Sequence, residues 1–382
     1  MARDLPQQPP PPPSPPQHQN PWRQTPLIES ANLSKAAGCR IFLKLDLHQP
    51  SGSFKSRGIG AYCLHALTTA PDPTRLHFYS SSGGNAGLAA VHAAQTLGRP
   101  CTVVVPLSTK PLMIAKLRAA GAAQVVQRGA SWKEADGYMR EVVMAEAERA
   151  GEVAVGVHPF DDPVVWDGNA TVVEEVEEQM VEMGVTGGPD VVVASVGGGG
   201  LFCGLVQGIL EDERRRGLWG TEILAVETLG AESLARALGD GRLVTLEGIT
   251  SLATSLGATR VAERTFELAR KWEKAGRVRS VVLSDAEAAM GCWCFADDER
   301  MLVELSCGVN LALCYGGRLE KALGRPVRKD EKVVIEVCGG QNVTAGMVEG
   351  WRQEYGDLDA AVDGDTQKVA NVPSAADAPK RA

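Results

Sequence analysis

The sequence predicts an α/β protein of two lobes, each built on a twisted, mainly parallel sheet flanked by helices. Short runs rich in Val, Ile and Ala alternate with helix-like stretches along the chain, as strands and helices do in α/β folds. The clearest strands, Cys101 to Val105 and Asp190 to Val196, are continuously apolar, like parallel strands that are buried on both faces. The chain has 382 residues, more than one compact core usually holds before it splits into lobes.

The individual elements follow from this alternation. We expect strands at 40–45, 75–79, 101–105, 124–127, 153–157, 190–196, 223–227, 279–283 and 332–337. We expect helical stretches at 59–67, 85–97, 111–121, 132–150 and 170–183, and a further helix after the glycines at 197–200. No internal repeat is visible along the chain.

Composition argues against several classes of protein. The formal net charge of −8 disfavours nucleic acid or an anionic membrane as the main partner. No apolar run reaches the roughly 20 residues of a membrane-spanning helix, and the N-terminus resembles neither a signal peptide nor a transit peptide. The nine cysteines are odd in number and lack metal-ligand spacing. We therefore expect a reducing compartment, the cytoplasm.

Two terminal segments have the composition of disordered tails. Residues 1–20 are dominated by Pro and Gln, and residues 357–382 are rich in Asp, Ala and polar residues. Neither segment carries enough apolar side chains to bury a core. The first could instead dock to a proline-binding module, but a plain tail explains it as well.

The first motif with chemical content is PSGSFKSRG, from Pro50 to Gly58. It places Lys55 in a Ser/Gly-rich turn just ahead of a helical stretch. The positive end of that helix and the nearby Arg57 should lower the pKa of Lys55, which suits an amine nucleophile or base. Taken alone, this motif is better explained by a surface lysine at a helix start.

Two glycine-rich loops each follow a predicted strand and open a helix. The loop SSSGGNAG, from Ser80 to Gly87, could offer backbone N–H groups to a carboxylate, although a plain helix cap explains it too. The glycines at 197–200 form a cradle suited to a phosphate. That run lacks the GK[ST] ending of an ATP-binding loop, and Phe202 stands at the last glycine position of GxGxxG. A dinucleotide-binding site is therefore disfavoured.

The fourth motif is VCGGQN, which follows the predicted strand at 332–337. It places the thiol of Cys338 at the carboxyl end of a strand, where α/β proteins bind their ligands. A buried core cysteine is the competing interpretation.

Together and in this order, the four motifs resemble the fold type II pyridoxal 5′-phosphate (PLP) enzymes, the tryptophan synthase β family. The resemblance is greatest to the serine/threonine dehydratases, specifically the eukaryotic catabolic L-serine dehydratases. It covers about residues 21 to 350, and the further segments that carry it are Thr25 to Leu27, Leu43 to Asp46, His158 to Pro163 and Glu227 to Thr228. Several ordered motifs at family-like spacing are more specific than any one of them.

The resemblance implies how the cofactor is held. Lys55 resembles the lysine that carries PLP as a Schiff base, and Phe54 resembles the aromatic residue beside the pyridine ring. Asn85 resembles the residue that donates to the 3′-oxygen, and Cys338 the partner of the pyridine nitrogen. The phosphate would lie on the residues of the glycine loop, namely Gly197, Gly198, Gly199, Gly200 and Leu201.

It also implies a substrate site and a cation site. The substrate carboxylate would be bound by the residues of the Ser/Gly loop, namely Ser81, Ser82, Gly83 and Asn85. A monovalent cation such as K⁺ would be bound through oxygens at Glu227, Ala231 and Ser233. The resemblance further implies an amino acid as substrate and a homodimer as the assembly.

The implied reaction is β-elimination of L-serine to pyruvate and ammonia, and of L-threonine to 2-oxobutyrate. Lys55 would remove the Cα proton, PLP would act as electron sink, and its phosphate would protonate the departing hydroxyl. A thiol at Cys338 cannot keep the pyridine nitrogen protonated as an Asp would. This favours elimination over transamination or racemisation.

The chain departs from the family pattern at a few positions, which leaves the substrate preference open. Relatives usually carry Pro and Ala where this chain has Leu305 and Ser306, and Ala where it has Val309. Gly83 stands where some relatives have Ala. The open alternatives are a threonine dehydratase, a serine racemase or a β-replacement synthase of the same fold, and a catalytically inactive homologue that binds partners through its proline-rich tail. Few residues follow Gly350, which disfavours the large regulatory region of biosynthetic threonine dehydratases.

We expect PLP to lie between the two lobes. The small domain should span residues 56–156, and the large PLP-binding domain should combine residues 21–55 with 157–352.

Overall fold

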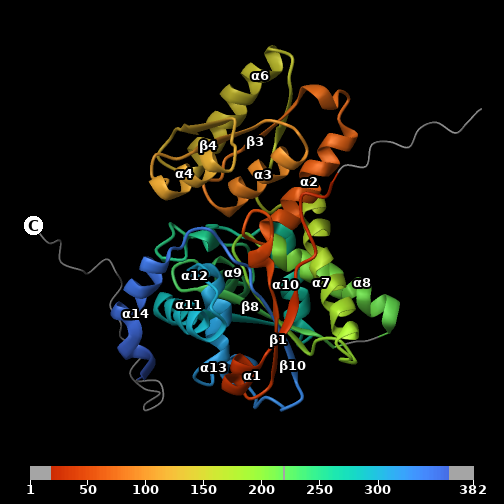
Figure 1. Cartoon of the computed structure of the whole chain (residues 1–382), viewed down its shortest axis with the longest axis vertical. Coiled ribbons are helices and arrows are strands. Elements are labelled where there is room, and N and C mark those ends of the chain that lie inside the picture. Colours follow the sequence, from red (N-terminus) through yellow and green to blue (C-terminus); the bar gives the residue numbers. More distant parts are fainter. Residues whose placement is uncertain (1–18, 218–219, 361–382) are drawn as a thin grey trace, which may run out of the picture.

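A computed structural model describes residues 19–217 and 220–360, and it confirms the predicted α/β class with two sheets (Figure 1). The tails predicted at 1–20 and 357–382 lie outside the described residues except for their inner ends. None of the helices in the described ranges is long and apolar enough to cross a membrane.

The larger, six-stranded sheet has the order β1-β2-β10-β7-β8-β9. β1 is antiparallel to β2, and every other pair is parallel. The strands are β1 (Leu27–Ser30), β2 (Arg40–Lys44), β7 (Val191–Ser195), β8 (Glu222–Thr228), β9 (Val278–Leu283) and β10 (Lys332–Glu336). β10, the last of the described strands, therefore lies between β2 and β7 and pairs with both.

The smaller, four-stranded sheet has the order β5-β4-β3-β6 and is wholly parallel. Its strands are β3 (Leu76–Ser80), β4 (Cys101–Val105), β5 (Gln124–Gln127) and β6 (Val153–Gly156). Together the two sheets contain every strand that the sequence predicts, with ends that coincide or differ by one residue.

Helices cover both sheets. In the first half of the chain they are α1 (Ala31–Ala37), α2 (Lys55–Thr69), α3 (Asn85–Thr96), α4 (Pro111–Ala119), α5 (Trp132–Tyr138), α6 (Ala145–Arg149) and α7 (Pro163–Glu182). In the second half they are α8 (Gly200–Arg216), α9 (Ser233–Asp240), α10 (Glu263–Lys274), α11 (Asp285–Glu299), α12 (Leu305–Leu311), α13 (Arg318–Leu323) and α14 (Ala345–Ala360).

Several boundaries differ from the sequence prediction. α7 begins at Pro163 and not near residue 170, because Asp162 caps it by accepting from the N–H of Val164 at 2.8 Å and proline suits the first helical position. The stretch predicted at 132–150 is α5 and α6 joined by a π-helical segment. α14 runs to Ala360, so residues 357–360 are helical and not part of a tail. The edge strand β1 was not predicted.

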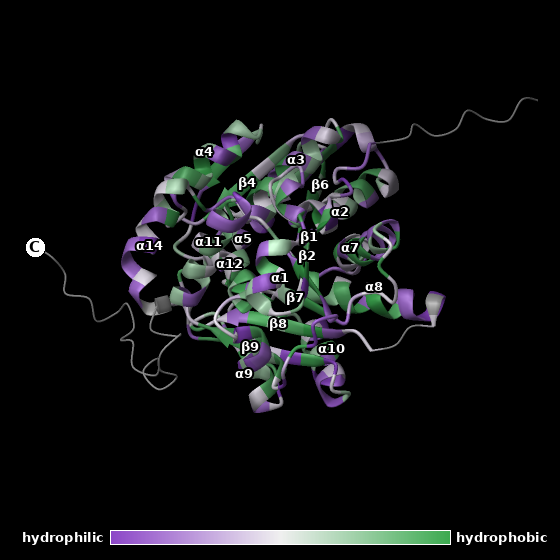
Figure 2. Cartoon of the chain, turned by 60° about the horizontal axis from the view of Figure 1, so that its bottom comes forward, coloured by the Kyte–Doolittle hydropathy of each residue, from purple (hydrophilic) through white to green (hydrophobic). Residues whose placement is uncertain are grey.

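Each sheet has its own hydrophobic core, and Figure 2 shows β7 and β8 as hydrophobic strands within the larger one. α2 links the two parts, since it packs against α3 of the smaller part and α7 of the larger. The predicted domain boundaries at 55/56 and 156/157 stay a prediction.

α2 and α7 touch backbone to backbone. A Cβ atom added at Gly58 would lie 2.6 Å from the carbonyl oxygen of Val165, and one added at Gly168 would lie 2.7 Å from that of Arg57. Real Cβ atoms do not approach so closely, so only glycine allows this spacing between the helices.

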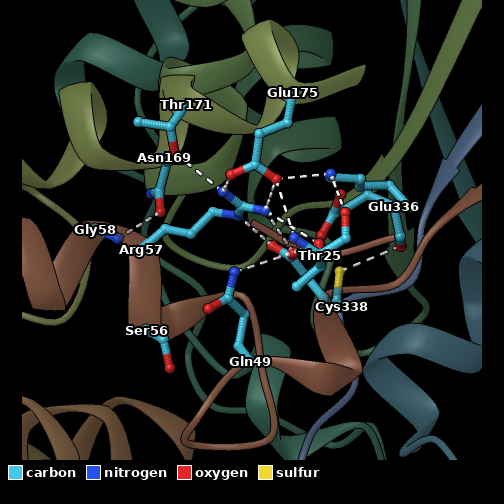
Figure 3. Close-up of polar contacts among 12 residues, drawn as sticks. Thr25, Gln49, Ser56, Arg57, Gly58, Asn169, Thr171, Glu175, Glu336 and Cys338 are labelled. Atoms are coloured by element: carbon cyan, nitrogen blue, oxygen red, sulfur yellow. Dashed lines mark hydrogen bonds and ion pairs between the residues drawn. The ribbon is translucent and has the colours of Figure 1, made fainter. Parts of the chain in front are cut away.

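A buried ion-pair network joins α2, α7 and the loop after β2 (Figure 3). The guanidinium of Arg57 is fully buried and contacts two carboxylates. Its Nε and Nη2 donate to Asp46 at 2.6 and 2.8 Å, and its Nη1 and Nη2 donate to Glu175 at 2.6 and 2.7 Å. Lys44 adds a second cation, 2.7 Å from Glu175. The two positive and two negative charges balance.

The protonation states in the network follow from its charges. Burial alone would raise the pKa of Asp46, but Arg57 holds it below its usual range. Glu336 lies at the end of β10 and is also buried. Burial and the nearby charge of Asp46 raise the pKa of Glu336 well above its usual range. Glu336 is therefore neutral at physiological pH.

Removal of one partner from this network should be costly. We expect Arg57→Leu to lower the free energy of unfolding by about 3–5 kcal/mol, because it leaves buried carboxylates without a cation. The midpoint of urea unfolding measures this effect.

The matched control is Arg40→Leu, which removes an exposed pair with Glu29 at 2.7 Å and should cost about 0–1 kcal/mol. Equal losses in the two variants would contradict the stabilising role of the buried network.

Candidate active site

The carboxyl ends of three adjacent strands, β2, β10 and β7, meet at one edge of the larger sheet. The segments that follow them carry Lys55, Cys338 and the glycine loop. The segment after β3 carries the Ser/Gly loop at the corresponding edge of the smaller sheet. The four motifs therefore occupy the position where parallel α/β sheets bind ligands.

Lys55 is the first residue of α2, and its Nζ donates to the carbonyl oxygen of Pro159 at 2.6 Å. The residue is half-buried, and burial of its amine lowers the pKa of Lys55 to about 8. Arg57 does not cause this shift as expected, because Asp46 and Glu175 bind its guanidinium. The lowered pKa of Lys55 therefore comes from burial of its amine and not from a nearby positive charge.

The loop that carries Lys55 is fixed to the loop after β10. The N–H of Phe54 donates to the carbonyl oxygen of Cys338 at 3.1 Å, and the N–H of Gly340 donates to that of Gly52 at 2.9 Å. These two contacts join segments nearly 290 residues apart in the sequence. Lys55, Phe54 and Cys338 thus lie together, as the resemblance predicts.

The sulfur of Cys338 contacts uncharged polar groups. Its Sγ lies 3.6 Å from the hydroxyl of Ser195 and 3.7 Å from the side-chain nitrogen of Asn310. A hydrogen bond with Cys307 and burial raise the pKa of the Cys338 thiol well above its usual range. The thiol is therefore protonated and uncharged.

The glycine loop is packed too tightly for any side chain. A Cβ atom at Gly198 would lie 2.4 Å from the ring of Phe160, and one at Gly199 would lie 2.0 Å from Oγ1 of Thr265. Gly199 also has φ of 94°, which favours glycine. In the described ranges, the N–H groups of residues 197–199 find no acceptor. Together with the N-terminus of α8, they form a cradle for an anion.

The Ser/Gly loop also offers free N–H groups. The hydroxyl of Ser82 accepts from the N–H of Gly84 at 3.3 Å, whereas the N–H groups of Gly83 and Asn85 have no acceptor among residues 19–217 and 220–360. The hydroxyl of Ser81 donates to Asp136 at 2.7 Å. Because its hydroxyl is engaged in this bond, Ser81 could contact the substrate only through its backbone N–H.

Gly83 leaves little space for an alanine side chain. A Cβ atom there would lie 2.7 Å from Cγ2 of Thr109 and 3.2 Å from Cγ1 of Val105. An alanine would require Thr109 to shift.

Asn85 is held by two contacts that the sequence did not predict. Its Nδ2 donates to Glu304 at 2.8 Å, and its Oδ1 accepts from the N–H of Gln341 at 2.9 Å. Gln341 lies in the VCGGQN motif, but nothing in the spacing of the sequence relates it or Glu304 to Asn85. Pro159 was missed for the same reason.

The predicted cation residues lie together between β8 and α9. Glu227 is buried, and its two carboxylate oxygens accept from the N–H groups of Leu234 and Ala235, each at 2.8 Å. Burial raises the pKa of Glu227 to about 8. The buried hydroxyl of Ser233 has no hydrogen-bond partner in the part of the chain that the structure describes. Ala231 is fully buried beside them.

These features define an α/β enzyme with a reactive lysine, an anion cradle and a buried thiol at the edge of its sheets. The chain belongs to the family of pyridoxal-phosphate dependent enzymes, whose family model matches residues 19–339.

Known relatives narrow the resemblance to the serine dehydratases. The L-serine dehydratase of Saccharomyces cerevisiae (strain AWRI1631) is 40% identical over 328 residues, which cover 85% of this chain and 94% of that protein. The L-serine dehydratase/L-threonine deaminase of Bos taurus is 40% identical over 335 residues, 87% of this chain and 95% of that protein. A fungal L-serine ammonia-lyase from Rhizomucor miehei matches in structure with a TM-score of 0.74 at 31% identity, covering 88% and 100% of the two chains. The predicted family resemblance is confirmed.

The residues present fit pyridoxal phosphate. Its aldehyde requires a neutral amine, and burial favours that form of Lys55. Its phosphate requires free N–H groups, and those of residues 197–199 have no other acceptor in the described segments. Its pyridine nitrogen requires a small polar neighbour, and the thiol of Cys338 is protonated.

The pKa of Lys55 can be tested without the cofactor. At pH 8 about half of an amine with a pKa near 8 is uncharged, against about 1% or less for an ordinary lysine. We expect the acetylation rate of Lys55 in the apoprotein to be half-maximal near pH 8 and to level off about one pH unit higher. Acetylation of the exposed Lys35 is the reference. Mass spectrometry of the digested protein measures both rates. A Lys55 profile that follows that of Lys35 would contradict the effect of burial.

Proposed function

We propose that this protein is a PLP-dependent L-serine ammonia-lyase that converts L-serine to pyruvate and ammonia. The observation that carries the proposal is the buried Lys55 amine, which lies in the same site as the free N–H groups of the glycine loop and the Cys338 thiol. The printed functions of the relatives from yeast, cattle and Rhizomucor miehei support it.

The site residues divide between cofactor and substrate. Lys55 would hold PLP covalently, Phe54 would pack beside the ring, and Cys338 would face the pyridine nitrogen. Asn85 would donate to the 3′-oxygen. The phosphate would be bound by the residues from Gly197 to Leu201, whose glycines leave the N–H groups open to an anion.

When bound, PLP supplies an electron sink for the pair left on Cα after proton removal. Lys55 acts as general base on the Cα proton, because its lowered pKa makes the free amine available near neutral pH. The Ser/Gly loop holds the substrate carboxylate on the N–H groups of Gly83 and Asn85. This orients the Cα–H bond towards Lys55.

The protonated, uncharged thiol at Cys338 favours β-elimination over transamination and racemisation. It does not supply the positive charge at the ring nitrogen that would favour a long-lived carbanion, so loss of the β-hydroxyl competes well with reprotonation at Cα. The Cα proton and the hydroxyl leave as the elements of water. The released enamine is hydrolysed to pyruvate and ammonia.

Threonine is the second candidate substrate, and the Bos taurus relative is named for both activities. Threonine differs from serine by one methyl group at Cβ, which a binding site discriminates only modestly. Gly83 adds no Cβ atom to the carboxylate loop, and we propose that 2-oxobutyrate forms from threonine as a secondary activity.

The cation, the assembly and the location complete the proposal. The buried hydroxyl of Ser233, which has no hydrogen-bond partner in the described residues, supports a monovalent cation such as K⁺, with Glu227 and Ala231 as the further ligands implied by the family resemblance. The homodimer rests on the family resemblance, and the cytoplasmic location rests on the sequence pattern.

A 2-oxo acid assay with each amino acid tests the reaction. We expect L-serine to have the higher kcat/KM, and Lys55→Ala to lower it by more than about 10²-fold because the general base is lost. The lysine-bound cofactor should give a visible absorbance band that Lys55→Ala abolishes.

The exposed Lys35→Ala variant is the control and should keep full activity. A Lys55→Ala enzyme that retained the band or the activity would rule out this role for Lys55, and a higher kcat/KM for L-threonine would reverse the order of substrates.

The cation site is tested by replacing its free hydroxyl. We expect activity to be several-fold higher in KCl than in tetramethylammonium chloride, and Ser233→Ala to reduce this ratio because one oxygen ligand is lost. Ser280→Ala removes another buried, unpartnered hydroxyl and should leave the ratio unchanged. An identical ratio in the wild type and Ser233→Ala would exclude Ser233 as a ligand.

A further inference from the structure

The side-chain amide of Asn85 forms a hydrogen bond at each of its two ends. Its Nδ2 donates to Oε1 of Glu304 at 2.8 Å, and its Oδ1 accepts from the N–H of Gln341 at 2.9 Å. Asn85 follows β3 of the smaller sheet, whereas both partners flank strands and helices of the larger one. The amide is thus fixed across the boundary between the two sheets.

Glu304 is itself held by two further donors. Its Oε1 also accepts from the hydroxyl of Ser306 at 2.5 Å, and its Oε2 accepts from the N–H of Asn342 at 3.0 Å. The residue is 3% exposed. Gly340 makes room for it, since a Cβ atom there would lie 2.0 Å from the carboxylate carbon of Glu304.

The carboxylate of Glu304 does not cap the helix that it precedes. Glu304 occupies the N-cap position of α12, and its side chain makes no hydrogen bond to the first N–H groups of that helix. It accepts instead from Asn85, Ser306 and Asn342. The contacts of this buried carboxylate are therefore directed at Asn85 and the loop after β10.

The network also fixes which end of the Asn85 amide faces which way. If the amide were flipped, its oxygen would face the Glu304 carboxylate and its NH₂ group would face the N–H of Gln341. Both contacts would be repulsive, so only one orientation is allowed. The amide nitrogen has two hydrogens, and only one is needed for Glu304. The other contact of this nitrogen, to the hydroxyl of Ser255, is long at 3.5 Å.

We propose that Glu304, set in place by Ser306, is a positioning residue that orients the Asn85 amide so that its second N–H points at an acceptor oxygen of the cofactor. This inference rests on the proposed function, which assigns that oxygen as the 3′-oxygen of PLP. The hydroxyl of Ser306 is the group that holds Oε1 of Glu304 beside the Asn85 amide.

Gln341 is fixed from the other side as well. Lys116, in α4 of the smaller part, donates to the backbone and side-chain oxygens of Gln341, the latter at 3.0 Å. The acceptor end of the Asn85 amide therefore contacts a residue that is itself anchored across the same boundary. Orientation of the amide and approach of the two sheets depend on one set of contacts.

The spectrum of the bound cofactor gives a readout that a purely structural role would not change. A hydrogen bond to the 3′-oxygen draws charge from it, and so weakens its hold on the proton that it shares with the lysine-bound nitrogen. Without that bond, the pH at which the visible band titrates should rise. We expect Glu304→Gln to raise this midpoint by about half a unit to one unit, because glutamine places an NH₂ group against one of the three donors.

Three variants separate orientation from stability. Ser306→Ala removes one donor and should shift the midpoint in the same direction by a smaller amount, with kcat/KM for L-serine reduced about two- to fivefold. Glu304→Gln should reduce it about tenfold or more. The control is Glu331→Gln, which alters another buried carboxylate that pairs with Arg325 at 2.6 Å. This control should lower the melting temperature and leave the spectroscopic midpoint unchanged.

The outcomes also separate this inference from the proposed function. If both Glu304→Gln and Ser306→Ala titrate like the wild type, the positioning role is wrong. If Glu304→Gln does not fold, Ser306→Ala alone decides the question. A wild type that binds PLP but forms no 2-oxo acid overturns the proposed reaction, whereas the midpoints still decide the role of Glu304. A wild type that binds no PLP overturns both.

Discussion

The double contact of Arg57 with Asp46 and Glu175 is the interaction on which the rest of the site depends. Burial of a guanidinium is costly unless its donors find acceptors. Here four bonds of 2.6–2.8 Å to the two carboxylates, and a fifth from Nη1 to the hydroxyl of Thr171 at 3.1 Å, satisfy it. Through them, the loop after β2, the start of α2 and the middle of α7 are held in one arrangement. Lys55 lies only two residues before Arg57, so its position follows from that of the network.

With the charge of Arg57 neutralised in this way, burial becomes the cause of the reactivity of Lys55. The same physical effect acts on the other groups of the site, since burial also raises the pKa values of Cys338 and Glu227. A lysine, a thiol and a carboxyl group are thus all shifted towards their uncharged forms. A site with an uncharged lysine and thiol beside an anion cradle suits a ligand that brings its own phosphate.

Sequence reasoning identified the parts of the site that local chain geometry encodes. A glycine run between a buried strand and a helix has few structural explanations, so the loop at 197–200 could be predicted. Glu304 and Gln341 could not, because their contacts with Asn85 cross between two sheets and leave no periodic trace in the chain. The edge strand β1 was missed because a four-residue run carries little pattern. The position of α7 depended on a cap at Asp162, which lies outside its apolar repeat.

The backbone contact between α2 and α7 bears on how this protein can change during evolution. Gly58 and Gly168 touch no ligand and carry no functional group, yet even one added carbon would push apart the helices that support Lys55 and Glu175. Which substitutions this region tolerates is therefore set by the distance between the backbones of α2 and α7, and not by any chemical role of the two glycines. At these two positions the spacing of the helices leaves room for no residue other than glycine.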